Sequence, residues 1–295
     1  MKIVKKADLY ILVDENDNEI KTPEDGYIKI EELTPELYRV YRSGAYGVIN
    51  NEGKEILPLN YDSIQYSGGM IWAKDYNARL YGGFSADGKQ VVEHQYEGVY
   101  GMFTDAVGVE KDGKWGVYSC SKNALVVDYI YDEFSMGHNG VFGDDRVWPK
   151  EQHLAMVSKN GKYGFINSEG IEVFPCLYKE DMYTAGKALG WLKRGSKSIW
   201  ATIEGYELER GVRLKEVKWA TRKDAFPEER KTYYGNLILA SKCVDGKKFK
   251  MGILNEDGSV LVDFKYDFIG DIVEAGGKLT AEVKVGRKMD KIVIE

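Results

Sequence analysis

A short pattern that returns along the whole chain constrains this sequence more than any other feature. The pattern is an aromatic–glycine pair (Met251-Gly252 in one copy), an apolar run, a turn of Asn, Asp, Ser or Gly, a second apolar run and then a tyrosine. The glycine of the pair is called the marker glycine below. In five copies the tyrosine follows it after 14 or 15 residues: 47→61, 82→96, 116→131, 164→178 and 252→266. Fixed spacing of this kind is the signature of a repeat architecture.

Two further copies are degraded. Ala201 takes the glycine position in the run Ile199-Trp-Ala-Thr-Ile, and Leu214–Trp219 is predicted as the later strand of that copy. Ile11 takes the same position near the N-terminus, where no room is expected for a first strand before Tyr10. The marker positions are then 11, 47, 82, 116, 164, 201 and 252, so the chain has about seven units at a mean interval of about 40 residues.

The composition agrees with many short strands joined by tight turns. The chain has 33 glycines and 21 tyrosines but 6 prolines in 295 residues. Glycine supplies the positive φ of tight turns, and tyrosine packs well on a pleated face. Each unit therefore reads as four antiparallel strands, for which the copy that starts at Leu154 predicts Leu154–Lys159, Tyr163–Asn167, Ile171–Pro175 and Leu177–Tyr183. The expected fold class is all-β.

The motifs themselves resemble a known family. Lys114-Trp115-Gly116 and Lys162-Tyr163-Gly164 are each followed by a polar turn and a later tyrosine, as in the WG-repeat (KWG-repeat) bacterial proteins. The resemblance extends over nearly the whole chain, although only Trp115 forms a true Trp-Gly pair. It implies a β-rich repeat scaffold and brings no shared catalytic residues.

Two arrangements of the units are open. Four strands in about 40 residues fit a propeller blade, and Lys278–Val285 would supply the first strand that the N-terminal unit lacks. A closed, propeller-like ring is the first prediction, and an open β-hairpin solenoid is the alternative. We find no linker or composition break, so residues 1–295 are predicted to form a single β-repeat domain.

Charge and cysteine content exclude several classes of protein. The formal net charge is −6, which argues against general nucleic-acid binding. No apolar run is long enough for a membrane helix, so we expect a cytoplasmic protein that does not bind membranes. The three cysteines are far apart, form no CxxC pair and are expected to be buried core thiols: Cys120, Cys176 and Cys243.

Three features could carry chemistry, and each has a simpler explanation. Asp14–Glu19 starts like a calcium loop but aligns with the turns of the other units, so a hairpin turn is expected. His138 and His153 flank Asp144 and Asp145 and could form a metal or acid–base cluster, although surface loop residues are the favoured interpretation. His94 is expected to be structural. We predict neither a metal site nor a cofactor.

Two long insertions mark the predicted binding face, since long loops on a regular scaffold usually carry function. They span Ser135–His153 and about Ala220–Gly235, and a stretch from Glu209 to Lys231 has eight basic against five acidic residues. Aromatic and arginine side chains dominate interface energy. The predicted partner-binding residues are Arg146, Trp148, Trp219, Arg222 and Tyr233.

The function that these observations favour is a non-enzymatic, monomeric scaffold for protein–protein interaction, with a glycan as a second kind of ligand. The alternative is a propeller-type enzyme that acts on a carbohydrate in a central pocket, which needs a pair of carboxylates. An immunity or accessory protein is compatible with the size and charge, but no individual residue supports it.

Overall fold

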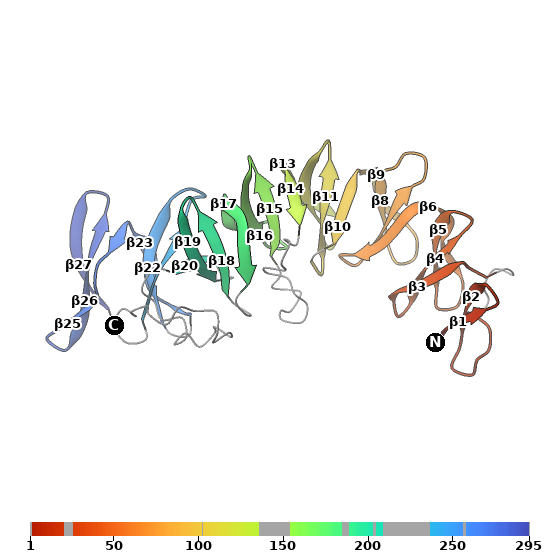
Figure 1. The fold of residues 1–295 in the computed structure, drawn as a ribbon, viewed down its shortest axis with the longest axis horizontal. Coiled ribbons are helices and arrows are strands. Elements are labelled where there is room, and N and C mark those ends of the chain that lie inside the picture. The colour runs from red at the N-terminus through yellow and green to blue at the C-terminus, as the bar shows by residue number, and fades with distance from the viewer. Residues whose placement is uncertain are drawn as a thin grey trace. The chain divides into compact units, whose positions relative to one another are not determined.

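The computed structural model describes residues 2–20, 26–101, 103–135, 154–184, 189–202, 205–208, 237–255 and 258–294. These residues form strands and turns, so the predicted all-β class is confirmed (Figure 1). None of them lies in a helix that could span a membrane. The chain divides into two compact units, residues 1–131 (unit 1) and 132–295 (unit 2). One domain over residues 1–295 stays a prediction.

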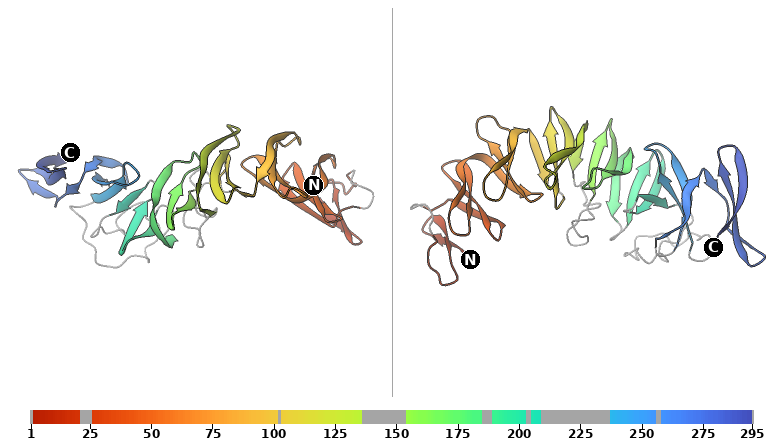
Figure 2. Two further views of the ribbon diagram at one scale, coloured as in Figure 1. Left: turned by 90° about the horizontal axis from the view of Figure 1, so that it is seen from above. Right: turned by 180° about the vertical axis from the view of Figure 1, so that it is seen from behind.

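Unit 1 holds three antiparallel sheets, formed by β1–β2, β3–β9 and β10–β13 in chain order. Its strands are β1 Lys2–Lys6, β2 Leu9–Val13, β3 Lys29–Thr34, β4 Leu37–Arg42, β5 Ala45–Asn50, β6 Glu55–Ser67, β7 Met70–Asp75, β8 Tyr81–Phe84, β9 Gln90–Tyr96, β10 Gly98–Gly101, β11 Ala106–Lys111, β12 Lys114–Ser119 and β13 Ala124–Tyr131. Successive hairpins therefore lie next to one another, as both views in Figure 2 show.

Unit 2 holds two antiparallel sheets, formed by β14–β23 in chain order and by β24–β27. Its strands are β14 Glu133–Ser135, β15 Ala155–Lys159, β16 Lys162–Ile166, β17 Glu172–Thr184, β18 Leu189–Arg194, β19 Lys197–Thr202, β20 Tyr206–Leu208, β21 Ile238–Cys243, β22 Phe249–Leu254, β23 Val260–Tyr266, β24 Phe268–Ile269, β25 Val273–Ala275, β26 Lys278–Val285 and β27 Lys288–Ile294.

The strand register explains the fixed spacing of the repeat. In each of five copies the residue before the marker glycine pairs directly with the tyrosine that ends the copy: Tyr46↔Tyr61, Tyr81↔Tyr96, Trp115↔Tyr131, Tyr163↔Tyr178 and Met251↔Tyr266. The glycine itself faces a bulge of three residues on the next strand. In the first of these copies the pair after Tyr46↔Tyr61 is Val48↔Leu57, so Gly47 lies opposite residues 58–60. The 14 or 15 residues from the marker glycine to the tyrosine are therefore the length of one hairpin and its bulge.

The bulge also explains why the marker residue is glycine. A Cβ atom on Gly47 would lie 2.8 Å from the carbonyl oxygen of Leu57, and one on Gly164 would lie 2.5 Å from that of Phe174. Real Cβ atoms do not approach backbone oxygens so closely, so a side chain here would push the bulged strand away. Glycine thus permits this close backbone approach, and Pro58 and Pro175 lie inside the bulges, where no ladder N–H is needed.

A four-residue turn recurs at the end of the second strand in all seven copies. Its fourth residue donates its backbone N–H to the carbonyl of the first, in turns 14–17, 50–53, 85–88, 120–123, 167–170, 202–205 and 255–258. Asp14 accepts the N–H groups of Asn16 and Asn18, as Asn50 does from Glu52 and Lys54. Asp14–Glu19 is therefore a hairpin turn, as predicted.

Neighbouring repeats share their hydrophobic cores. In the copy around Gly164, Phe165, Phe174 and Tyr178 are fully buried and their rings meet edge to face at centroid distances of 5.8 Å. Leu192 and Ala201 of the next copy complete the same cluster. The core of one repeat is thus closed by the repeat that follows.

Three predicted details are wrong. The third and fourth strands of the Leu154 copy are one strand, β17, and β6 is its counterpart in unit 1, because the chain continues through the bulge without a break. The N-terminal copy does have a first strand, β1, which pairs with β2 along its length. The strand that pairs with β19 after Ala201 is β20, whereas Leu214–Trp219 lies outside the described residues.

Candidate binding surface

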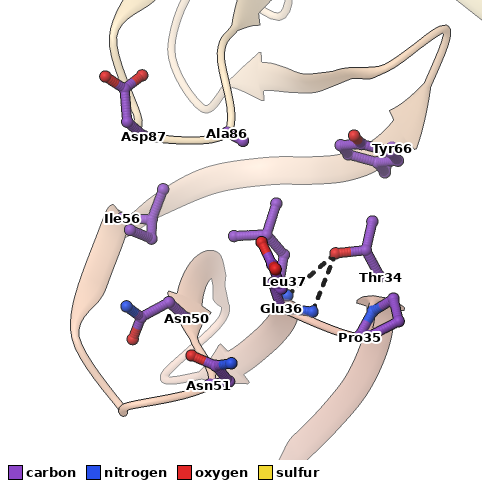
Figure 3. Close-up of a pocket in the computed structure, with 10 residues that line it drawn as sticks. All are labelled: Thr34, Pro35, Glu36, Leu37, Asn50, Asn51, Ile56, Tyr66, Ala86 and Asp87. Carbon is purple, nitrogen blue, oxygen red and sulfur yellow. Dashed lines mark hydrogen bonds between the residues drawn. The ribbon is translucent and has the colours of Figure 1, made fainter.

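A pocket with a volume of about 590 Å³ lies beside the turns at one end of the strands of the seven-stranded sheet in unit 1. Three turns border it, and these join β3 to β4, β5 to β6 and β8 to β9. The lining residues are Thr34, Pro35, Glu36, Leu37, Asn50, Asn51, Ile56, Tyr66, Ala86 and Asp87 (Figure 3). The pocket therefore lies between two adjacent repeats and belongs to both.

The floor is apolar and the rim is built from rigid turns. Leu37 is buried in the core cluster of this sheet, against which the half-buried Ile56 and Tyr66 pack. The Thr34 hydroxyl accepts the N–H groups of Glu36 and Leu37 at 3.3 and 3.1 Å, as Figure 3 shows. Because the turn satisfies its own backbone in this way, its shape is set before any ligand arrives.

Gly88 holds the third turn against the second hairpin. It has φ +86°, and a Cβ atom on it would overlap the carbonyl oxygen of Ile56. Gly205 has the same relation to Val173 in unit 2, with φ +88° and a hypothetical Cβ 2.7 Å from the Val173 oxygen. The turn glycine thus sets the distance between neighbouring repeats, and with it the width of the pocket.

The pocket is anionic. Glu36 and Asp87 are its charged lining residues, and the other eight are neutral. Asp87 accepts hydrogen bonds from the Ser85 hydroxyl and from the Lys89 N–H, which lower the pKa of its carboxyl. The rim therefore keeps negative charge well below neutral pH, beside an apolar floor.

A second cluster, in unit 2, is structural. The Glu207 carboxylate is 4% exposed; it accepts hydrogen bonds from the Tyr178 hydroxyl at 2.6 Å and from Arg194 Nη2 at 2.6 Å. The Arg194 guanidinium lies 3.9 Å from the centre of the Phe249 ring. Burial beside this carboxylate raises the pKa of Tyr178. With its charge paired, Glu207 joins two repeats and does not face a cleft.

Comparison with known sequences identifies the repeat. The family described as WG containing repeat matches residues 46–77, 81–115 and 251–288. The chain carries WG repeats at three positions. Gly47, Gly82 and Gly252 are the marker glycines of these WG repeats, and Gly116 and Gly164 face the same kind of bulge outside or at the border of the matches. None of the curated proteins matches the sequence.

Several solved structures share a general resemblance. A eukaryotic initiation factor is 10% identical over 99% of this chain and 84% of its own, with a TM-score of 0.40. Kluyveromyces lactis Hsv2 is 10% identical over 88% and 95%, with a TM-score of 0.27, and the N-terminal domain of Nup159 is 8% identical over 89% and 72%, with 0.28. These are β-propeller proteins, but likeness at this level carries no argument about closure.

All five predicted partner-binding residues lie outside the described residues. Arg146 and Trp148 fall within 136–153, and Trp219, Arg222 and Tyr233 fall within 209–236. The His138–His153 cluster lies in the first of these segments. These predictions stay predictions. Within the described ranges, no group of three or more His, Cys, Asp or Glu side chains could hold a metal ion.

The predictions for the remaining histidine and the cysteines can be compared with the structure. His94 stacks on Tyr61 at 6.2 Å and meets Phe84 edge to face at 5.7 Å, which is a structural role, as predicted. The three thiols are half-buried, where full burial was expected. Burial still raises the pKa of Cys120 and of Cys176 to about 12, so both stay protonated and are poor nucleophiles.

The sequence alone did not indicate the pocket or the Glu207 cluster. The pocket residues belong to ordinary turns, and only the stacking of one repeat on the next brings them together. Glu207 lies in a degraded copy whose marker position holds Ala201, so the repeat pattern assigned it no role. One signal for the pocket was present in the sequence. Gly88, which borders the pocket, is the last residue of its turn, and the turns 50–53, 167–170, 202–205 and 255–258 also end on glycine.

Proposed function

We propose that this chain is a non-enzymatic scaffold whose WG repeats bind another protein. The pocket between the repeats of unit 1 carries the proposal, because it joins an apolar floor to an anionic rim on preformed turns. A pocket of about 590 Å³ accepts one or two projecting side chains, and its charge favours a basic side chain with an apolar stem. The partner is therefore proposed to insert a lysine- or arginine-bearing loop.

The insertions remain part of this proposal. Because aromatic and arginine side chains dominate interface energy, five residues of the insertions and the basic stretch are proposed as further anchors for the partner: Arg146, Trp148, Trp219, Arg222 and Tyr233. A cytoplasmic protein that acts as a monomer, without cofactor, nucleic acid or membrane, is proposed on the same sequence grounds.

Charge reversal at the pocket tests the proposal. The double variant Glu36→Lys/Asp87→Lys is expected to bind a partner, isolated by affinity capture and then purified, at least about tenfold more weakly by calorimetry. The expected change in unfolding free energy is about 1 kcal/mol, because both side chains are exposed but Asp87 gives up the hydrogen bonds that it accepts from Ser85 and Lys89.

The matched control is Glu169→Lys/Asp271→Lys, which changes the net charge equally at exposed positions of unit 2. It should bind the partner as the native protein does. Equal affinity of both double variants would exclude the pocket as the binding site, and equal weakening would indicate a general charge effect.

We also propose that the repeats continue as an open array instead of closing into a ring. Two pairings support this. β6 and β17 carry hydrogen bonding from one repeat into the next, whereas propeller blades are separate sheets. β26 is paired on one edge by β24 and β25 and on the other by β27, so it has no edge left to complete an N-terminal blade.

Solution X-ray scattering distinguishes the two arrangements. A closed ring of 295 residues should have a radius of gyration close to the compact-domain value of about 19 Å. The open array is expected to exceed that value clearly and to give a distance distribution with a long tail. A radius near 19 Å would contradict the open array and restore the ring.

A further inference from the structure

Unit 2 gathers positive charge on the turns that join the first and second strands of its repeats. These turns are called the basic edge below and span residues 159–162, 193–197, 242–250 and 284–288. They contain twelve Lys or Arg against one Asp, in a chain whose formal net charge is −6. The turns after the second strands contain four Asp or Glu and neither Lys nor Arg, and they span 167–170, 202–205 and 255–258. Charge is therefore segregated between the two sets of turns.

Strand β17 joins the first two turns of the basic edge. It pairs with the first turn through Tyr178↔Tyr163 and, one residue later, with the second turn through Lys179↔Lys193. The chain thus passes directly from one turn to the next, and no other element of the fold lies between them in this pairing.

The remaining turns continue the same edge. The Arg194 guanidinium of the second turn lies 3.9 Å from the centre of the Phe249 ring in the third. Beside the third turn, Tyr266 pairs with β22, and the next residue, Asp267, donates its backbone N–H to the carbonyl of Lys284 in the fourth turn at 2.8 Å. The four basic turns therefore follow one another along a single edge of unit 2.

Positive residues lie directly opposite one another along this edge. Three of the cross-strand pairs are Lys159↔Lys162, Lys179↔Lys193 and Lys242↔Lys250. Like charges at opposite positions destabilise a sheet. Because the arrangement recurs at a cost in stability, it indicates that the charge has a role in binding.

Ion pairs within the chain leave much of this charge exposed. Carboxylates neutralise Arg194, Lys248 and Lys250. Five other cations of the edge are exposed and form no ion pair with a residue that the structure describes: Lys159, Lys162, Lys247, Arg287 and Lys288.

Two carboxylates that border the basic edge are directed to its backbone. Asp132 accepts the N–H of Asn160 in the first turn at 2.7 Å, and Asp267 accepts the N–H of Gly286 in the fourth at 2.6 Å. These acids stabilise the turns and so fix the positions from which the lysines project.

The residue types of the edge favour carboxylates over nucleic acid as its ligand. Ten of the twelve cations are lysines, which act as point charges, whereas arginine is the usual residue for bidentate recognition of phosphate. The rings at these turns, Tyr163 and Phe249, are half-buried and offer no platform on which bases could stack. The net negative charge of the chain repels a long polyanion, while a short acidic segment meets the edge alone.

We propose that the basic edge of unit 2 binds an extended segment of a partner protein that is rich in Asp and Glu. Its carboxylates pair with the cations of successive turns. Each exposed ion pair contributes little, so the affinity comes from the number of pairs, and it decreases as salt screens them. This rests on the proposal that the partner is a protein, but it uses unit 2, whereas the pocket lies in unit 1.

A synthetic peptide tests the edge in the full chain. The probe is the capped peptide Glu-Ser-Glu-Ser-Glu-Ser-Glu-Ser-Glu-Ser-Glu-Ser, titrated by fluorescence anisotropy at about 50 mM NaCl, where exposed charges are weakly screened. The edge variant Lys159→Gln/Lys162→Gln/Arg287→Gln/Lys288→Gln is expected to bind it at least about tenfold more weakly than the native protein. Arginine at the same three lysine positions keeps the charge and should keep the affinity within about threefold.

A matched variant controls for overall charge. Lys54→Gln/Lys89→Gln/Lys122→Gln/Lys278→Gln removes four exposed lysines at turns outside the basic edge, and it should bind the peptide within about twofold of the native protein. Equal weakening of both variants would reveal a general charge effect and overturn the proposal. So would equal binding of the same peptide with Gln in place of Glu, or no binding of the acidic peptide by the native protein.

Two further probes test the class of partner. Heptathymidylate carries as many negative charges as the peptide and should bind more weakly than it does. Tighter binding of heptathymidylate would make a nucleic acid the ligand and overturn the proposal. Sedimentation of the native protein, but not of the edge variant, with vesicles of phosphatidylserine and phosphatidylcholine would do the same in favour of a membrane.

The pocket variant separates this inference from the proposed function. Glu36→Lys/Asp87→Lys should bind the acidic peptide at least as tightly as the native protein does, although it binds the captured partner more weakly. If the peptide is lost in the pocket variant and kept in the edge variant, the basic edge is excluded and the pocket stands.

Discussion

Replacement of Arg194 by methionine is expected to lower the free energy of unfolding by about 3–5 kcal/mol at pH 7, because it leaves a buried carboxylate without its counter-charge. Glu207 is 4% exposed in the native protein, and Arg194 holds it through Nε at 3.2 Å and Nη2 at 2.6 Å. In the variant the Tyr178 hydroxyl still donates to the Glu207 carboxylate. Chemical denaturation measures the loss as a lower midpoint at constant slope.

A double variant provides the control. Arg194→Met/Glu207→Gln removes both charges, keeps an acceptor for the Tyr178 hydroxyl and should recover much of the lost stability, because no unpaired charge is then buried. A double variant as unstable as the single one would show that packing of Arg194 on Phe249, and not the unpaired charge, is responsible.

Replacement of Gly164 by alanine is expected to destabilise the protein by about 3 kcal/mol, by forcing a bulged strand out of place. The new Cβ atom would lie 2.5 Å from the Phe174 oxygen and 2.8 Å from the Cys176 nitrogen. Both are backbone atoms, so no side-chain rotation relieves the overlap. Chemical denaturation of the variant gives the value, and the aromatic near-ultraviolet signal should weaken with the edge-to-face packing of the core.

Two other glycines serve as controls of different kinds. Gly270→Ala meets its nearest atom at 3.4 Å without a positive φ, and it should cost no stability. Gly161→Ala has open space but φ +67°, so it should cost about 1 kcal/mol from backbone strain alone. If Gly164→Ala costs no more than Gly161→Ala, steric overlap at the bulge does not explain the marker glycine.

The repeat could be predicted because five copies solve the same local problem. A glycine must face the bulge, a polar turn must follow, and the tyrosine must return to the register of the residue before the glycine, so Gly164 and Tyr178 keep their distance in the sequence. Hairpins depend on nearby residues and leave a pattern. The predicted turn at Asn160 and Gly161 is present for that reason, with φ values of 54° and 67°.

The strand β1 and the continuous strand β17 were missed because pairing, and not local pattern, decides them. Every residue of β1 is exposed, so no alternation marks it, and its hydrogen bonds to β2 alone define it. In β17 the run at Pro175 resembles a break, but the strand bends through a bulge and continues into the next repeat. Proline within a bulge costs no ladder bond, so the chain need not end the strand there.

By itself the sequence determined the all-β class, the hairpin turns and the positions of the marker glycines. These features depend on backbone φ angles, on hydrogen bonds across one hairpin and on the alternation of side chains within one strand. The tertiary structure alone decided how one repeat lies on the next. That contact creates the pocket between Leu37 and Asp87 and the pairing of Arg194 with Glu207. Each of these joins residues that no local spacing relates, since the distance between repeats follows from packing against Gly88 and Gly205 and not from the order of residues in the chain.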